Sequence, residues 1–133
     1  MDACSAYGVP LGEAFQLRDD VLGVFGDPDH MGKSHLDDLR EGKCTSLIVR
    51  ALRDATPAQA KRLRAVIGDP QLGEPEAAEV RDILTSTGAR AAVERMIEKR
   101  YEQALHALDT APFAHGAVST LKAVAEAAVH RTA

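Results

Sequence analysis

Cysteine is almost absent from this chain, which has two among its 133 residues. Cys4 and Cys44 lie far apart and neither belongs to a C-x-x-C pair, so the sequence suggests neither a disulfide framework nor a zinc site. The five histidines show no H-x-x-x-H spacing. We therefore expect reduced thiols and treat all five histidines as structural or surface residues.

Long apolar runs and an excess of basic charge are also missing. No stretch approaches the ~20 apolar residues that a membrane-spanning helix needs, and Met1–Cys4 lacks the basic start and apolar core of a signal peptide. The net charge of −4 argues against a general nucleic-acid binder, which would carry a basic excess or stripe. We expect a soluble, cytoplasmic protein with one domain over 1–133, because this length is enough to bury a single core.

Helical periodicity runs through most of the chain. Apolar residues recur at spacings of three and four, and no segment alternates as a strand would, so the fold class is predicted to be all-α. A polar loop is expected from His30 to Lys43, and Pro10 is placed in the first turn of the first helix. The predicted helices cover 9–25, a segment including 47–52 capped by Thr45, 57–67 capped by Thr56, 75–84, 89–108 and 113–131.

The pair Asp19 and Asp20 lies in the strongly apolar first helix. Adjacent carboxylates repel each other, so the pair calls for a cation, and Mg²⁺ held against a phosphate is the natural candidate. Taken alone, such a pair is more often a solvated acidic surface. Two Gly-Lys pairs, Gly32-Lys33 and Gly42-Lys43, follow within one loop and favour a site for a phosphorylated ligand.

The order of these residues resembles the second aspartate-rich region of the trans-isoprenyl diphosphate synthases, the polyprenyl synthetase family, and in particular the actinobacterial type of geranylgeranyl and polyprenyl diphosphate synthases. That region reads Phe-Gln-x-x-Asp-Asp, then Gly-Lys, then Asp-Leu-x-x-Gly-Lys-x-Thr. The matching residues are Phe15, Gln16, Asp19, Asp20, Gly32, Lys33, Asp38, Leu39, Gly42, Lys43 and Thr45. This ordered set is far more specific than a lone glycine motif.

The resemblance implies a helical bundle, the C-terminal portion of the isoprenoid synthase fold, with motif region 1–45 followed by scaffold helices in 46–133. It also implies a Mg²⁺ cofactor and an allylic diphosphate ligand. Asp19 would bind the metal, with Asp20 and Asp38 assisting through its water shell. Lys33 and Lys43 would contact the diphosphate. The supporting residues would be Gln16, which hydrogen-bonds near the site, Phe15, which packs beneath it, and the loop glycines Gly32 and Gly42.

Two positions depart from the family pattern. Many members carry a third aspartate four residues after the first, where this chain has Gly23, so we expect a thinner metal clamp on that side. At Leu36 the family usually has glycine, and the bulky side chain is expected to displace Lys33.

The first aspartate-rich motif of the family is not found in this sequence, where no second Asp-Asp-x-x-Asp occurs. We therefore expect a partial prenyltransferase that binds metal and diphosphate with little or no turnover alone. Two alternatives stay open: a subunit that completes a split or heteromeric synthase by docking on an N-terminal half or homologue, and a non-catalytic helical interaction module. Self-association through faces normally covered by the missing helices is also expected.

Overall fold

The computed structural model describes residues 3–26, 36–110 and 113–131, and within these ranges it contains helices and no strand, which confirms the all-α prediction. The helices are α1 (Ala3–Phe25), α2 (Asp37–Glu41), α3 (Ser46–Asp54), α4 (Pro57–Val66), α5 (Glu74–Ser86), α6 (Ala89–Thr110) and α7 (His115–Val129). None of these described helices combines the length and hydropathy that crossing a bilayer requires. The chain divides into two compact units, the first made of 3–18 with 94–131 and the second of 19–93.

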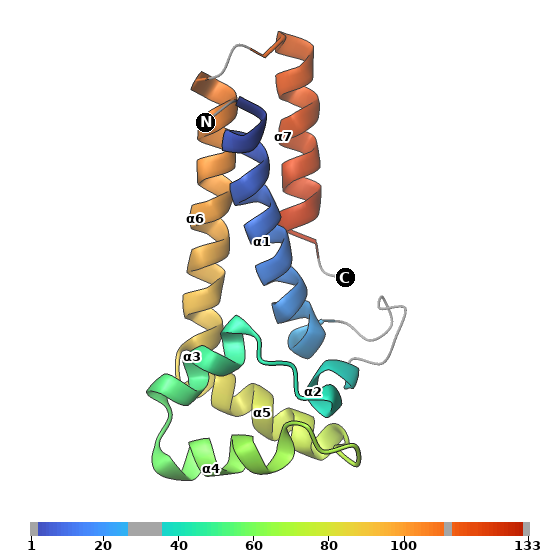
Figure 1. Cartoon of the computed structure of the whole chain (residues 1–133), viewed down its shortest axis with the longest axis vertical. Coiled ribbons are helices and arrows are strands. Elements are labelled where there is room, and N and C mark those ends of the chain that lie inside the picture. The colour runs from blue at the N-terminus through green and yellow to red at the C-terminus, as the bar shows by residue number, and fades with distance from the viewer. Residues whose placement is uncertain (1–2, 27–35, 111–112, 132–133) are drawn as a thin grey trace. The chain divides into compact units, whose positions relative to one another are not determined.

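The first unit is a bundle of three helical segments. The first part of α1, α6 from Glu94 onward and α7 run side by side (Figure 1). Their core is built around Tyr7 and mostly small side chains, Ala104, Ala107, Leu108 and Ala125. Alanine at these positions lets the helix backbones approach closely while still removing apolar surface from water. The Tyr7 hydroxyl donates a hydrogen bond of 2.8 Å to the Leu121 carbonyl, so its one polar atom is satisfied.

The second unit contains the end of α1, helices α2 to α5 and the first turn of α6. Helices α3, α4 and α5 contact one another pairwise (Figure 1). Large aliphatic side chains fill this core, and the most completely buried are Leu47, Leu63, Leu72, Val80 and Leu84. The Arg81 guanidinium donates from Nε to the Val24 carbonyl at 2.8 Å, which satisfies an acceptor in the last turn of α1.

The cap residues predicted for the starts of α3 and α4 are confirmed. Thr56 caps α4: its side-chain hydroxyl accepts a hydrogen bond of 3.2 Å from the Gln59 backbone N–H, and its own backbone N–H donates one of 3.0 Å to the Gln59 side-chain oxygen. This reciprocal pair is a capping box, and Pro57 follows at the first helical position. Thr45 is the cap residue of α3 as predicted, but its side chain makes no capping hydrogen bond.

Two predictions about the first third of the chain are wrong. Helix α1 begins at Ala3 instead of residue 9, so Pro10 lies inside the helix and not in its first turn. An internal proline sacrifices one backbone hydrogen bond, but the turns before it bury Tyr7 and thereby stabilise the extension. The predicted loop over 30–43 is also interrupted by α2, whose buried Leu39 anchors it.

Candidate functional site

Asp19 and Asp20 lie in the last third of α1, at the start of the second unit, and both are half-buried. Neither carboxylate is free, because both residues take part in interactions with their surroundings. Helical spacing places Gly23 on the same face, four residues after the first aspartate and three after the second. Gly23 is buried, so this face of α1 is covered by another part of the second unit.

That covering part is α2, which brings in Asp38. An ideal Cβ built on Gly23 would overlap the Asp38 Oδ2 atom, and would lie 3.4 Å from its Cγ. The other carboxylate oxygen of Asp38 forms an ion pair of 3.1 Å with Lys43 Nζ. The structure therefore brings two of the predicted site residues, Asp38 and Lys43, together beside Gly23 of α1.

Lys43 is exposed at the edge of this cluster. Its pKa is raised, because the hydrogen bond to Asp38 and the charge of that carboxylate outweigh desolvation, and the charges of Glu41 and Asp20 add smaller increases. Carboxylates from α1 and α2 thus act on the same ammonium group. The arrangement places a cation among carboxylates, which suits a ligand that carries both metal ions and phosphate oxygens.

Gly42 shapes the turn that returns Lys43 to α2. Its φ of 73° lies in the left-handed region, where glycine has no steric penalty. A Cβ at this position would also stand 3.2 Å from the Gly68 Cα, so two backbones meet closely here. The Lys43 N–H then bonds back to the Asp38 carbonyl at 3.2 Å. This explains why glycine precedes the lysine.

The predicted place of Phe15 beneath the site is wrong. Its side chain is 41% exposed, and the Arg131 guanidinium lies 4.2 Å above its ring within the first unit. The buried stripe of α1 passes instead through Ala14, Leu17 and Val21, so residue 15 falls beside it. Gln16 is exposed and takes part in an interaction of its own.

Gly32 and Lys33 lie outside the described residues, so their predicted roles stay predictions. Leu36, which replaces a glycine of the family pattern, is 7% exposed and belongs to the buried core. Its carbonyl accepts the Arg40 N–H at 2.9 Å at the start of α2. The expected displacement of Lys33 by this side chain likewise concerns a residue that the structure does not describe.

The donor set fits magnesium as an ion shared with a ligand. Among the residues described, no group of three or more His, Cys, Asp or Glu side chains is arranged to hold a metal by itself. Magnesium rarely uses such an all-protein cage; it binds one or two carboxylates, keeps several waters and takes substrate phosphates as further ligands. Asp20, whose charge acts on Lys43, and the adjacent Asp19 are donors of the type that such a partial site would use.

Arg18, next to the acidic pair, forms an ion pair with a residue far away in the chain. Its guanidinium contacts Glu94 through two hydrogen bonds of 2.7 and 2.9 Å. Its Nε donates to the Val129 carbonyl at 2.7 Å. Glu94 lies 76 residues away in the chain, so no helical spacing rule in the sequence identifies it. The only sign of such a partner in the sequence is an arginine within an apolar helix, because an arginine that becomes buried needs a counter-charge.

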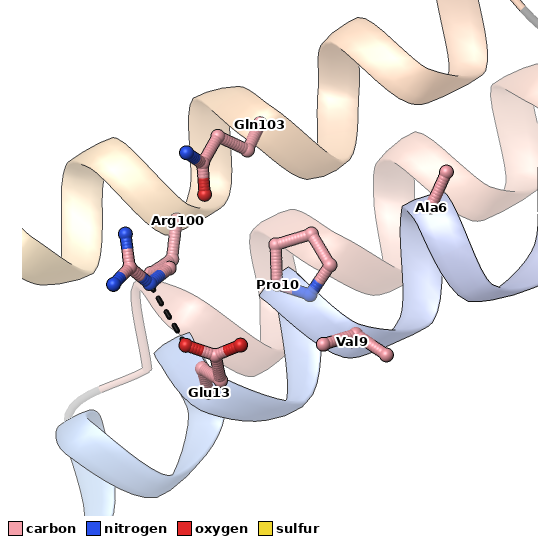
Figure 2. A pocket seen from close by; sticks show the side chains of 6 residues that line it. All are labelled: Ala6, Val9, Pro10, Glu13, Arg100 and Gln103. Atoms are coloured by element: carbon pink, nitrogen blue, oxygen red, sulfur yellow. Dashed lines mark hydrogen bonds and ion pairs between the residues drawn. The ribbon is translucent and has the colours of Figure 1, made fainter. Parts of the chain in front are cut away.

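An open groove of about 450 Å³ lies in the first unit. Figure 2 shows its lining: Ala6, Val9, Pro10, Glu13, Arg100 and Gln103. Glu13 and Arg100 form an ion pair of 2.9 Å across one end. None of the residues that the sequence selected for chemistry lines this groove.

A second titratable cluster joins α6 to the end of α7. His130 contacts Glu126 through Nδ1 at 2.8 Å and Glu98 through Nε2 at 2.7 Å. Burial lowers the pKa of His130, but the hydrogen bonds and charges of the two carboxylates outweigh it and leave the pKa raised. Tyr101 donates to Glu126, and this bond is the main reason that its pKa is raised to about 12.

Comparison with known proteins gives a consistent result. The family model described as polyprenyl synthetase matches residues 1–85. The chain superimposes with a TM-score of 0.91 and 39% identity on a crystal structure of geranylgeranyl pyrophosphate synthase from Corynebacterium glutamicum complexed with isoprenyl diphosphate and magnesium, covering 97% of this chain and 37% of that one.

Two curated relatives agree with this match. The geranylgeranyl diphosphate synthase of Saccharolobus solfataricus is 42% identical over 65 residues, which cover 49% of this chain and 20% of the relative. The octaprenyl diphosphate synthase of Escherichia coli is 35% identical over 109 residues, which cover 80% of this chain and 32% of the relative. The chain thus spans between a fifth and a third of the length of these relatives.

Proposed function

Because the chain belongs to the polyprenyl synthetase family, we propose that it carries the diphosphate-binding part of a trans-prenyltransferase of isoprenoid biosynthesis. Its ligand is an allylic isoprenyl diphosphate bound through Mg²⁺. Asp19 is the direct metal ligand, and Asp20 and Asp38 assist through bound water. Lys43, and Lys33 from the segment outside the described residues, contact the diphosphate oxygens.

The observation that carries this proposal is the cluster of Asp20, Asp38 and Lys43. Carboxylates from two different helices act on one exposed lysine, and the ion pair of 3.1 Å holds its ammonium group in place. An isolated surface lysine would lose considerable side-chain entropy on binding a ligand, whereas one already anchored loses less. The ammonium group of Lys43 is therefore already held in place before a polyanion binds.

The chemistry of the family explains why such a cluster is useful. Ionisation of an allylic diphosphate develops negative charge on the departing group, and preorganised cations stabilise that charge. Bound magnesium neutralises part of the diphosphate. Lys43 contributes a further positive charge, and its raised pKa keeps it protonated as the ligand approaches. Asp38 orients this lysine through the ion pair.

We further propose that these 133 residues bind the ligand but turn it over little by themselves. The sequence contains no complete Asp-Asp-x-x-Asp motif. A diphosphate held by one acidic pair and two lysines is bound, but its charge is only partly neutralised in the transition state. Binding without appreciable rate is the expected outcome. Radiolabelled elongation of an allylic diphosphate by the purified chain alone would contradict this part of the proposal.

Isothermal titration of the purified chain with inorganic diphosphate, with and without Mg²⁺, tests the binding site. We expect saturable heat that requires the metal. Asp19→Ala removes the direct ligand and should abolish it, whereas Asp20→Ala should weaken binding about tenfold by acting through the metal's water shell. Asp82→Ala, an exposed position on α5, is the matched control and should bind like the natural chain.

Three results would count against the assignment. An absence of metal-dependent heat from a chain that circular dichroism shows to be helical would remove the site. Equal losses from Asp19→Ala and Asp20→Ala would mean that the direct and water-mediated roles are misassigned. Loss of binding in Asp82→Ala would indicate a general charge effect instead of a defined site.

A second candidate function is that the chain completes a synthase by docking on a separate N-terminal half or a homologue. The groove in Figure 2 favours it, because Val9 is 51% exposed beside the apolar ring of Pro10. Sedimentation tests this candidate: it predicts concentration-dependent association, which a charged substitution of Val9 reduces. A monodisperse monomer at high concentration, with no apolar dye bound, would leave a non-catalytic helical module as the better description if diphosphate binding also failed.

A further inference from the structure

Gly23 differs from the other glycines of α1 in what surrounds it. A Cβ built at Gly8 or Gly12 would meet nothing within 4 Å, whereas one built at Gly23 would overlap the Asp38 carboxylate. Gly23 is buried, so the space beside its backbone is filled by a polar side chain from α2. Glycine inside a helix costs roughly 0.5–1 kcal/mol relative to alanine, and a compensating contact is therefore informative.

The Asp38 carboxylate is held in that space from its other side. One oxygen lies against Gly23, and the other pairs with Lys43 Nζ at 3.1 Å. The left-handed turn at Gly42 returns the chain so that the Lys43 N–H also bonds to the Asp38 carbonyl. The carboxylate thus lies between the Lys43 ammonium group and the α1 backbone at Gly23.

We propose that Gly23 is a positioning residue whose missing side chain admits the Asp38–Lys43 ion pair to the face of α1 that carries Asp19 and Asp20. In this interpretation the missing side chain of Gly23 leaves space for an acidic side chain from another helix, and we call this space the seat. Gly23 is then not a position that has lost a metal ligand. The consequence for ligand binding rests on the function proposed above; the seat itself does not.

The two interpretations of Gly23 predict opposite results for one variant. If the position has merely lost a ligand, Gly23→Asp restores the third aspartate of the family pattern and tightens Mg²⁺-dependent diphosphate binding. If Gly23 is a seat, the new side chain displaces Asp38, releases Lys43 and weakens binding. We expect a loss of at least tenfold in affinity for inorganic diphosphate with Mg²⁺ present. Tighter binding than in the natural chain would overturn the proposal.

A double-mutant cycle measured by urea unfolding without metal or ligand tests the seat directly. Gly12→Ala, on the same helix with open space around it, should lower the unfolding equilibrium constant about two- to fivefold through helix propensity alone. Gly23→Ala should instead leave that constant unchanged or raise it, because the Asp38 carboxylate must shift away from the new methyl group and this offsets the gain in helix propensity. In an Asp38→Ala background the collision is gone, since the Asp38 Cβ lies 3.7 Å from the added atom, an ordinary contact.

We therefore expect Gly23→Ala to stabilise the Asp38→Ala protein by the same two- to fivefold as the Gly12→Ala control. Additive effects of the two substitutions, or stabilisation by Gly23→Ala in the natural background, would overturn the seat. If the cycle shows coupling but the natural chain binds no diphosphate, the seat stands and the proposed function fails. If binding is present and the cycle is additive, the function stands and the seat fails.

Discussion

Two arginine–glutamate pairs of nearly the same geometry offer a test of what burial adds to an ion pair. Arg18 contacts Glu94 at 2.7 and 2.9 Å, and Arg62 contacts Glu79 at 2.6 and 2.7 Å. The side chains of the first pair are 10% and 35% exposed, and those of the second 46% and 45%. Only Arg18 also donates to a backbone carbonyl, that of Val129.

The expected cost of Arg18→Ala follows from these contacts. The charged hydrogen bond to the Val129 carbonyl contributes about 1.5–3 kcal/mol. Loss of the Glu94 pair adds about 1 kcal/mol, less than the full penalty for breaking a buried pair, because Glu94 remains partly solvated. We expect the free energy of unfolding to fall by about 3 kcal/mol. Arg62→Ala should cost only about 0.5 kcal/mol, as is usual for an exposed pair.

Urea unfolding followed by circular dichroism measures both variants. A loss of about 3 kcal/mol corresponds to a fall in the urea midpoint of about 2 M for a slope near 1.5 kcal/mol/M. Arg18→Lys keeps the charge but not the planar fork, and should lose about half as much. Salt at 1 M should reduce the contribution of Arg62 and leave that of Arg18 almost unchanged. Equal losses from the two alanine variants would refute the reasoning from burial.

Two further predictions concern the helix ends. Because the pKa of His130 is raised in the folded protein, its contacts with Glu98 and Glu126 stabilise the fold fully below the unfolded histidine pKa of about 6.5, and this stabilisation is lost as the pH rises through the folded pKa. His130→Gln should remove this pH dependence of the urea midpoint between pH 6 and 8.5. An unaltered pH profile in the variant would contradict the assignment. Thr56→Ala removes the acceptor for the Gln59 N–H and should destabilise the fold by about 1 kcal/mol, whereas a change below 0.2 kcal/mol in thermal or urea unfolding would mean that the capping box contributes nothing.

Elements whose signals are local could be predicted from the sequence. Thr56 and Pro57 define the start of α4 because a cap and a first-turn proline act within four residues. The same rule wrongly placed Pro10 in the first turn of α1. The turns before Pro10 are stabilised by the burial of Tyr7, and the residues that bury it lie more than 90 positions later in the chain. Helix α2 was missed for a similar reason: five residues are too short to show a period, and Leu39 is recognised as an anchor only once it is buried.

The amino-acid sequence alone determined the all-α class, the family and the choice of Asp19, Asp20, Asp38 and Lys43, because helical periodicity and an ordered motif are properties of the chain itself. Only the tertiary structure identified the neighbour of Gly23, because the atom that fills the space of a missing side chain comes from a different part of the chain. It also supplied the partner of Arg18, because burial calls for a counter-charge but the packing of distant helices selects it.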